Sequence, residues 1–269
     1  MKNRNLPCLT FLAVLFWIPV TGTSMQPDTL WNQTDSQGKK QGHWKKLTPE
    51  GGLIYKGFFI EDRPVGKMQR YYENGNKQAD LNFMEGTGET YATIYYQNGQ
   101  VAAIGKYLEM QKDSVWSYFS YYTSSLSYME TYLEGRKHGK SMKFYPEGSV
   151  SEILNWEDDL KHGKWQQFYE DSTLRLSSSY LRGELHGEYR VWGRDSIPLI
   201  QGTYVKGKMD GDWSFYDIAG HLANRLEYEN GKIMNKEAME EWVKKYMDEI
   251  ESKLGKIPEV EFENFFDRK

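Results

Sequence analysis

Apolar and polar residues alternate along most of the chain, a pattern typical of β-strands that turn one face to a core. In residues 174–181 the side chains that share one face are Leu174, Leu176, Ser178 and Tyr180. The same order returns in residues 222–228 and 53–59, and each segment ends on an aromatic ring. An aromatic stretch at 165–169 and turn residues at 170–173 precede the first segment. The pattern therefore predicts a β-hairpin over residues 165–181.

This unit recurs along the chain, and an aromatic ring closes every copy. Successive closing rings are 24 residues apart, except for one step of 25 into Tyr132. The closing rings are Phe59, Phe83, Tyr107, Tyr132, Trp156, Tyr180, Tyr204 and Tyr228. An anchor residue stands near the start of each copy, as Gly42, Gly66, Gly139, Gly163, Gly187 and Gly211, and as Thr90 and Ser114 in the third and fourth. A fixed period in this range indicates a repeat array.

The repeats occupy residues 38–233, and their fold class follows from the alternation. We predict an all-β repeat: an elongated, twisted single-layer antiparallel sheet of about eight β-hairpins. Pairs such as Asn74-Gly75 and Asn98-Gly99 supply residues that tolerate a positive φ in the turns. At ~4.8 Å per strand, some sixteen strands would give a sheet of roughly 75 Å. The anchor glycine is expected in the loop that joins one hairpin to the next.

A different period begins at Asn235 and predicts an amphipathic helix over residues 235–255. Its apolar face consists of Met239, Trp242, Val243, Tyr246, Met247, Ile250 and Leu254. Asn235 can cap the start and Gly255 can end the helix. Repeat arrays need a cap on exposed core, so we expect this helix to cover the end of the sheet. Docking to a partner or to a membrane surface is the alternative. In the tail at 256–269, residues 260–266 are apolar at alternate positions and are expected to add an edge segment.

The N-terminus has the three-part order of a secretory signal peptide. Lys2 and Arg4 precede an apolar run at 9–20, and small residues follow it at 21–24. The run is too short to span a membrane as a helix, which takes ~20 residues. We predict a signal peptide at 1–24, hence export to the periplasm, the outer surface or the medium, with a buried helix as the alternative. Residues 25–37 are expected to form a flexible lead-in.

Charge and cysteine content narrow the classes of partner and chemistry. The chain carries a net charge of -4, and removal of Lys2 and Arg4 with the signal gives -4 minus 2, or -6. A negative chain is a poor ligand for phosphate backbones, so nucleic acid is not expected as a partner. The single cysteine, Cys8, lies within the predicted signal. The mature chain would then have neither a disulfide nor a thiol nucleophile.

No motif in the chain predicts a catalytic or metal site. His138, His162 and His186 each precede an anchor glycine, but equivalent positions of adjacent hairpins are ~10 Å apart, too far to share one zinc ion. Residues 86–88 have too few glycines for a phosphate loop, and no nucleophile elbow or metalloprotease pair occurs. We expect a protein that is not an enzyme and needs no cofactor or metal.

A second set of rings lies two residues after the anchor in five copies: Trp44, Trp116, Trp165, Tyr189 and Trp213. The closing rings are expected to pack as core. A single-layer sheet cannot bury both of its faces, so this second set is the candidate binding stripe, for protein or for sugar. The third to fifth copies, where the pattern relaxes, are the place where a specific partner would have left its mark.

The glycine, tryptophan and Phe-Tyr core of the unit and its closing aromatic-x-x-Gly, as in residues 180–183, 204–207 and 228–231, resemble MORN repeats. The likeness over residues 38–231 is closer to the bacterial variant found in the YwqK family of antitoxins. The resemblance implies a series of hairpins that serve as a scaffold for protein contacts and, in some relatives, lipid contacts. It implies no catalytic residue. An antitoxin meets its toxin in the cytoplasm, so the predicted signal peptide argues against that role.

These observations favour an exported, non-enzymatic repeat scaffold that binds another protein at the bacterial cell envelope. Two alternatives stay open. One is a carbohydrate-binding ribbon that uses the faces of the rings, and the other is a membrane-surface protein that uses the helix at 235–255.

Overall fold

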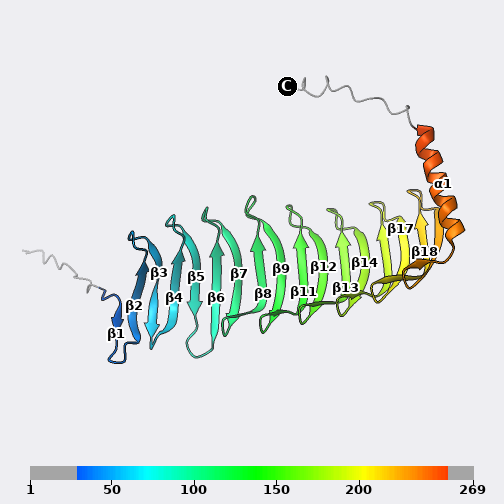
Figure 1. Cartoon of the computed structure of the whole chain (residues 1–269). Helices are drawn as coiled ribbons and strands as arrows, with labels where there is room; N and C mark the ends of the chain where they lie inside the picture. Colours follow the sequence, from blue (N-terminus) through cyan, green and yellow to red (C-terminus); the bar gives the residue numbers. More distant parts are fainter. Residues whose placement is uncertain (1–28, 254–269) are drawn as a thin grey trace, which may run out of the picture.

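The computed structural model describes residues 29–253, which form one open antiparallel sheet followed by a single helix (Figure 1). The predicted fold class is confirmed. The first ten strands are β1 (Gln33–Thr34), β2 (Lys40–Leu47), β3 (Leu53–Ile60), β4 (Arg63–Tyr71), β5 (Lys77–Phe83), β6 (Glu89–Tyr95), β7 (Val101–Leu108), β8 (Gln111–Phe119), β9 (Leu126–Leu133) and β10 (Arg136–Lys137). The others are β11 (Gly139–Phe144), β12 (Val150–Glu157), β13 (Leu160–Phe168), β14 (Leu174–Leu181), β15 (Glu184–Leu185), β16 (Gly187–Trp192), β17 (Pro198–Val205), β18 (Lys208–Tyr216), β19 (Leu222–Glu229) and β20 (Lys232–Ile233).

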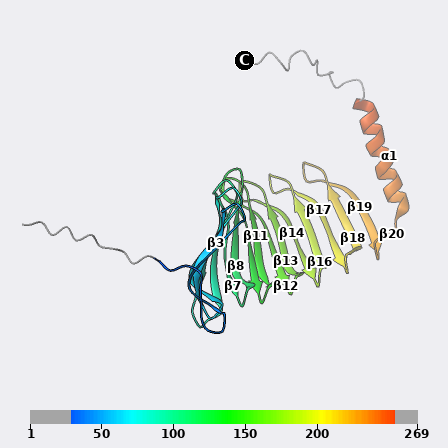
Figure 2. The ribbon, with the colours of Figure 1, turned by 60° about the vertical axis from the view of Figure 1, so that its left-hand side comes forward.

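Each strand pairs with its neighbours in sequence, so the chain advances through the sheet one hairpin at a time. β13 pairs with β12 on one side and with β14 on the other, and the same holds along the array. Viewed after a rotation of 60°, the blue N-terminal strands overlap one another while the yellow C-terminal strands stand apart (Figure 2). The sheet is therefore twisted along its length, as strand geometry requires.

Two kinds of turn close the two long edges of the sheet. At one edge two successive residues have positive φ, for example Asp158 at 50° and Asp159 at 66°, as in the type I′ turns that match strand twist. At the other edge one residue has positive φ, such as Gly75 at 83°. The asparagine and glycine residues predicted for the turns thus lie where the backbone needs them.

The anchor glycine is not in a connecting loop, and that prediction is wrong. Gly163 lies inside β13 with φ of 79°, where the pairing with β12 slips between Leu154 and Trp156. This is a β-bulge, a site that favours glycine because φ is positive. Ser114 tolerates the same conformation with φ of 57°. At Thr90 the β5–β6 register is continuous and the loop before it is longer, since a β-branched residue is unsuited to positive φ.

Tyrosine hydroxyls tie consecutive hairpins together at the second edge. The hydroxyl of Tyr145 donates to the carbonyl of Phe168, 23 residues on, at 2.8 Å, and Tyr169 donates to Trp192 in the same way. Tyr72 and Tyr96 repeat the contact further toward the N-terminus. The second aromatic residue of the predicted Phe-Tyr pair is therefore a clasp between neighbouring units.

Both ends of the sheet are closed by asparagine side chains. The side chain of Asn32 accepts a hydrogen bond from Lys45 N at 2.9 Å on the free edge of β2. Asn235 accepts from Glu227 N at 2.8 Å and donates to Arg225 O at 3.0 Å on the free edge of β19. These amides occupy backbone groups that another strand would use, which limits edge-to-edge association.

Residues just before the array are ordered by it. β1 pairs with β2 through Gln33 and Gln41, so the predicted flexible lead-in at 25–37 is wrong for its second half. The free backbone edge of β2 recruits this segment. Residues 25–28, the predicted signal peptide at 1–24 and the tail at 256–269 lie outside the described residues.

The helix α1 (Lys236–Lys253) begins where predicted and packs on the sheet through its first turns only. The ring of Trp242 lies 5.2 Å from that of Phe215 in β18. Further on, Tyr246 is 61% exposed, because the helix rises beyond the last strands (Figure 1). Asn235 does not serve as the predicted helix cap, since its side chain bonds to β19. The helix covers one corner of the core.

Candidate interaction surfaces

The two sets of rings lie on one face of the sheet, which we call the aromatic face. All eight closing rings are buried or half-buried there, which confirms the expectation that they form core. In the second set Trp116 is 0% and Trp213 2% exposed. The prediction that these two rings lie open to a ligand is wrong. Trp44, Trp165 and Tyr189 are half-buried, and their role in binding stays a prediction.

A glycine opposite the ring explains why two of the tryptophan side chains are fully buried against the sheet. The ring of Trp213 covers Gly202 and that of Trp116 covers Gly105, where any Cβ would overlap ring atoms. Their indole groups also have partners: Nε1 of Trp116 donates to Lys106 O at 2.9 Å. The periodicity predicts the aromatic face for these rings correctly, but how deeply each ring is buried depends on the size of the residue opposite it on the neighbouring strand.

Four lysines lie over rings of the aromatic face. Nζ of Lys112 is 4.9 Å from the ring centre of Trp116 and 5.0 Å from that of Tyr132. The others are Lys40 over Phe59, Lys137 over Trp156 and Lys161 over Tyr180. Burial lowers the pKa of Lys112. Such cation–π contacts occupy ring faces that a sugar would need.

The pattern breaks at the fifth hairpin, formed by β11 and β12. Ser141 stands where five other copies carry a ring, and the space is an open trough of about 290 Å³. We call this trough the ring gap; it is lined by Tyr128, Glu130, Lys137, Ser141, Lys143, Glu152, Leu154, Trp156, Lys161 and Trp165, with Met129 and Met142 at its base.

Charged side chains replace apolar ones around the ring gap. The side chains of Glu130 and Glu152 are only 13% and 16% exposed. Glu130 pairs with Lys137, and Oε1 of Glu152 lies 2.9 Å from Nζ of Lys143. Burial acts to raise the pKa of Glu152, but hydrogen bonds from Gln167 and Lys143 outweigh it and lower this pKa. Glu152 is therefore held as a carboxylate inside the aromatic face.

Burial also alters the tyrosines beside this region. Tyr118 stacks on Tyr128 with ring centres 4.3 Å apart. Burial raises the pKa of Tyr118 to about 12, and it raises the pKa of Tyr132 further, helped by the hydrogen bond to Glu130. Both phenols stay neutral hydrogen-bonding groups at physiological pH and offer no nucleophile.

The opposite face carries a feature that the sequence reasoning missed. Three neighbouring apolar side chains cross the centre of the sheet, Met129, Met142 and Ile153, and Ile104 lies in line with them on the far side of Ser117; we call these four residues the apolar row. Met142 lies directly between Met129 and Ile153 in the register. Ile104 is 45% exposed, and no second layer covers this row in the described part of the chain. The sequence did contain an indication of this row, because the equivalent positions in the outer hairpins are occupied by polar residues.

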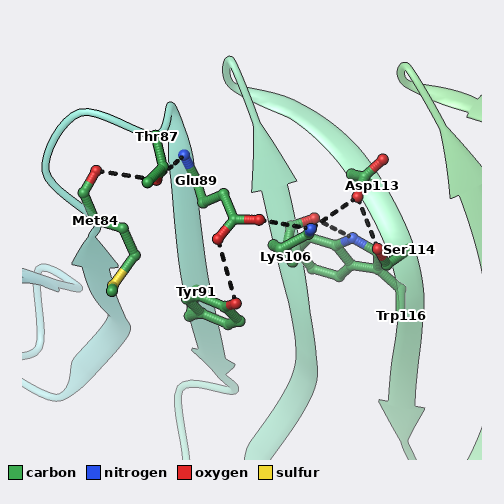
Figure 3. A network of polar contacts seen from close by, with 8 residues as sticks. All are labelled: Met84, Thr87, Glu89, Tyr91, Lys106, Asp113, Ser114 and Trp116. Carbon is green, nitrogen blue, oxygen red and sulfur yellow. Dashed lines mark hydrogen bonds and ion pairs between the residues drawn. The ribbon is translucent and has the colours of Figure 1, made fainter.

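A polar network borders the apolar row and links three strands (Figure 3). Nζ of Lys106 in β7 lies 2.9 Å from Glu89 in β6 and 3.1 Å from Asp113 in β8. Hydrogen bonds to Glu89 and Asp113 raise the pKa of Lys106, and the Ser114 hydroxyl, which donates to Asp113 at 2.7 Å, leads the effects that lower the pKa of Asp113. The network joins the two hairpins whose anchor glycine is replaced. Its groups already have partners, so it is a structural clamp.

Metal-ligand clusters and membrane-spanning helices are both absent from residues 29–253. No cluster of three or more potential metal ligands occurs there. Nδ1 of His162 lies 3.1 Å from Glu157. No helix in this part of the chain has both the length and the apolar character needed to cross a bilayer.

Comparison with known families adds one identification. Residues 64–85, which include β5 and most of β4, match the family model described as MORN repeat variant. This hairpin is similar to a MORN repeat variant. The predicted resemblance is confirmed, and the other hairpins keep the register of this MORN repeat. Repeats of this type indicate a protein involved in protein or membrane interaction.

Two other comparisons add little to this MORN assignment. No curated protein matches the chain. A solved structure described as "Crystal Structure of TcdB2-TccC3" is similar at 10% identity with a TM-score of 0.16, over 74% of this chain. The chain spans 16% of the length of that protein, and the likeness is too low to support any argument.

Proposed function

We propose that this MORN-repeat chain is an exported, non-enzymatic scaffold that binds another protein at the cell envelope, and that the apolar row is its docking surface. The observation that carries the proposal is the uncovered row itself. Apolar side chains that cross a sheet face without a covering layer are typical of interaction sites. Two of the four are methionines, whose flexible side chains adapt to a partner surface.

The charges beside the row favour a particular partner. Lys140 and Lys164 are exposed on this face, on the strands next to Met129 and Ile153, and form no ion pair among residues 29–253. A partner that presents apolar side chains flanked by carboxylates would satisfy both features. We therefore expect association to weaken as salt concentration rises.

Docking is tested by retention of envelope proteins on the immobilised mature chain. Ile104→Glu places a charge in the apolar row and should abolish retention of the specific partner. Ser177→Glu, on the polar part of the same face, is the matched control and should retain it. Equal retention by both variants, with both folded by circular dichroism, would contradict the docking surface.

Export rests on the layout of residues 1–24 and needs its own test. A chain tagged at its C-terminus should appear in the envelope or periplasmic fraction in a processed form, and deletion of 1–24 should keep it in the cytoplasm. Full-length chain in the cytoplasmic fraction would rule out export while leaving the docking surface open to the first test.

Membrane-surface binding through α1 is the second candidate, because Val243, Tyr246 and Met247 are exposed along the helix. The helix carries six acidic and four basic residues, a balance that disfavours anionic lipid. Flotation with phosphatidylglycerol vesicles should therefore leave the chain at the bottom of the gradient. Flotation that a Tyr246→Glu change abolishes would favour the membrane role instead.

A further inference from the structure

The ring gap departs from the repeat in three positions at once. Ser141 replaces the ring, Glu130 of the fourth hairpin stands where the fifth has Leu154, and Glu152 of the fifth stands where the sixth has Leu176. The core-forming face thus exchanges apolar volume for two carboxylates at a single place. Partial burial of charge is unfavourable unless partners compensate it, and each carboxylate here is held by a lysine and by one further hydrogen-bond donor.

Both carboxylates are fixed in place and keep capacity for a ligand. Oε2 of Glu130 accepts from the Tyr132 hydroxyl at 2.6 Å, and its Oε1 faces Lys137. Oε2 of Glu152 accepts from Gln167 at 3.0 Å, and its Oε1 faces Lys143. A carboxylate oxygen can accept two hydrogen bonds, so each Oε1 can take one more donor from within the trough.

The wall of the trough adds a flat ring and an ammonium group. Trp165 is half-buried on the far side of Leu154 from Ser141, with Nε1 at 3.3 Å from Glu152. Lys161 lines the trough and forms no ion pair in the described part of the chain. With Lys137, Lys143 and Lys161 against Glu130 and Glu152, the lining has a formal charge of +3 minus 2, or +1.

These features match one class of ligand. A sugar ring has hydroxyl donors around its edge and an apolar C–H face, and the trough, at about 290 Å³, is near the lower end of the size of small-molecule sites. We propose that the ring gap binds one residue of an acidic polysaccharide, a sugar of the uronic-acid type. Its hydroxyls donate to Glu130 and Glu152, its C–H face lies on Trp165 and its carboxylate pairs with Lys161.

The ring gap opens on the aromatic face and the apolar row lies on the other face; Met129 and Met142 contribute to both, but Ile104, the residue changed in the docking test, does not line the ring gap. The two proposals can therefore fail separately. Ile104→Glu, which disrupts the apolar row, should leave sugar binding unchanged.

The test is calorimetric titration of the folded chain with a trimer of galacturonate and with a neutral glucose trimer. We expect the acidic trimer to bind at least tenfold more tightly. Ser141→Trp returns the residue used by other copies and fills the trough, so binding should fall at least tenfold while the melting temperature holds or rises. Lys161→Met should remove the preference for the acidic trimer.

Three results would overturn the proposal. They are no heat with either trimer at millimolar concentration, equal affinity for the two trimers, or unchanged binding in folded Ser141→Trp. Should Ser141→Trp fail to fold, Lys161→Met decides alone, because its side chain lies at the surface of the trough. A retained preference for the acidic trimer would then refute the assignment.

Discussion

The last hairpins and the fifth hairpin use the same repeat with opposite results. In β17 and β18, Gly202 leaves room for Trp213, whose ring is buried against Tyr189 and Tyr204 with centres 5.7 and 5.0 Å away. In β11 the equivalent position holds Ser141 in place of a ring, and the aromatic face opens there into a trough lined partly by charged side chains. A repeat fixes the backbone, while one side chain in each copy decides whether that copy is closed core or a potential site.

Removing the ring where the face is closed should have the largest effect. Trp213→Ala would leave a cavity against Gly202 and Tyr204, and we expect a loss of about 3–5 kcal/mol in the free energy of unfolding. Urea denaturation followed by circular dichroism measures it. Ser141→Ala, at the matching position of the open hairpin, is the control; it removes the hydroxyl that accepts from Trp156 Nε1 at 2.8 Å and donates to Leu154 O, and should cost only about 0.5–1.5 kcal/mol. Similar losses of stability at both positions would contradict the distinction between a closed hairpin at Trp213 and an open hairpin at Ser141.

Crowding the closed region is the next test. Gly202→Ala adds a Cβ that overlaps the ring of Trp213, so the ring must shift out of its packed position. We expect destabilisation of about 1–3 kcal/mol, as for other overpacked cores. Thermal unfolding measures it, and Gly193→Ala, where the nearest atom would be 3.8 Å away, is the control. A neutral Gly202→Ala would mean that the ring is not confined.

The tyrosine clasps should contribute less than the buried rings. Tyr169→Phe removes the hydroxyl that donates to Trp192 O and leaves the ring in place, so we expect a loss of about 0.5–1.5 kcal/mol. Tyr122→Phe is the control, since that residue is 90% exposed. Equal denaturation midpoints for the two variants would show that the clasp adds nothing to the contact between hairpins.

The smallest effect concerns charge in the open hairpin, and it depends on pH. The folded-state pKa of Glu152 is lowered, so its contribution is present above the unfolded pKa of about 4.3 and is lost as pH falls through the folded value. Glu152→Gln should therefore be less stable than the wild type at pH 7, by about 1 kcal/mol or less, because Lys143 is largely exposed. The difference should shrink as pH falls below the unfolded pKa and vanish once pH has passed below the lowered folded-state pKa. A difference that grows in acid would reverse the assigned sign.

The sequence was sufficient for the architecture because the signals are local and repeated. Alternation placed the closing rings on one face, and β14 spans the residues predicted for the second strand of its hairpin. The bulge at Gly163 was missed because a positive φ serves a turn and a bulge equally well, and only the strand pairing distinguishes them.

The candidate surfaces were harder to predict, since they depend on contacts between copies. Trp116 and Trp165 look alike in sequence, yet one lies over Gly105 and the other opposite Leu154, which changes their depth. The apolar row needs the register of several strands before Ile104 and Met142 can be seen to lie in one line. The predicted stripe therefore lies on one face as expected, but the side chains of Trp116 and Trp213 are buried and not exposed.

Asn235 occupies the position at which a ninth copy would have its anchor glycine, 24 residues after Gly211. Its side chain forms a hydrogen bond with β19, and α1 begins at the next residue, so the helix takes the place of a ninth hairpin. Each hairpin pairs only with its immediate neighbours. Loss or duplication of a whole hairpin upstream would therefore leave the contacts of Asn235 and α1 with the last hairpin unchanged. The length of the molecule can thus change during evolution in steps of one hairpin, about 10 Å each, with the same finished end every time.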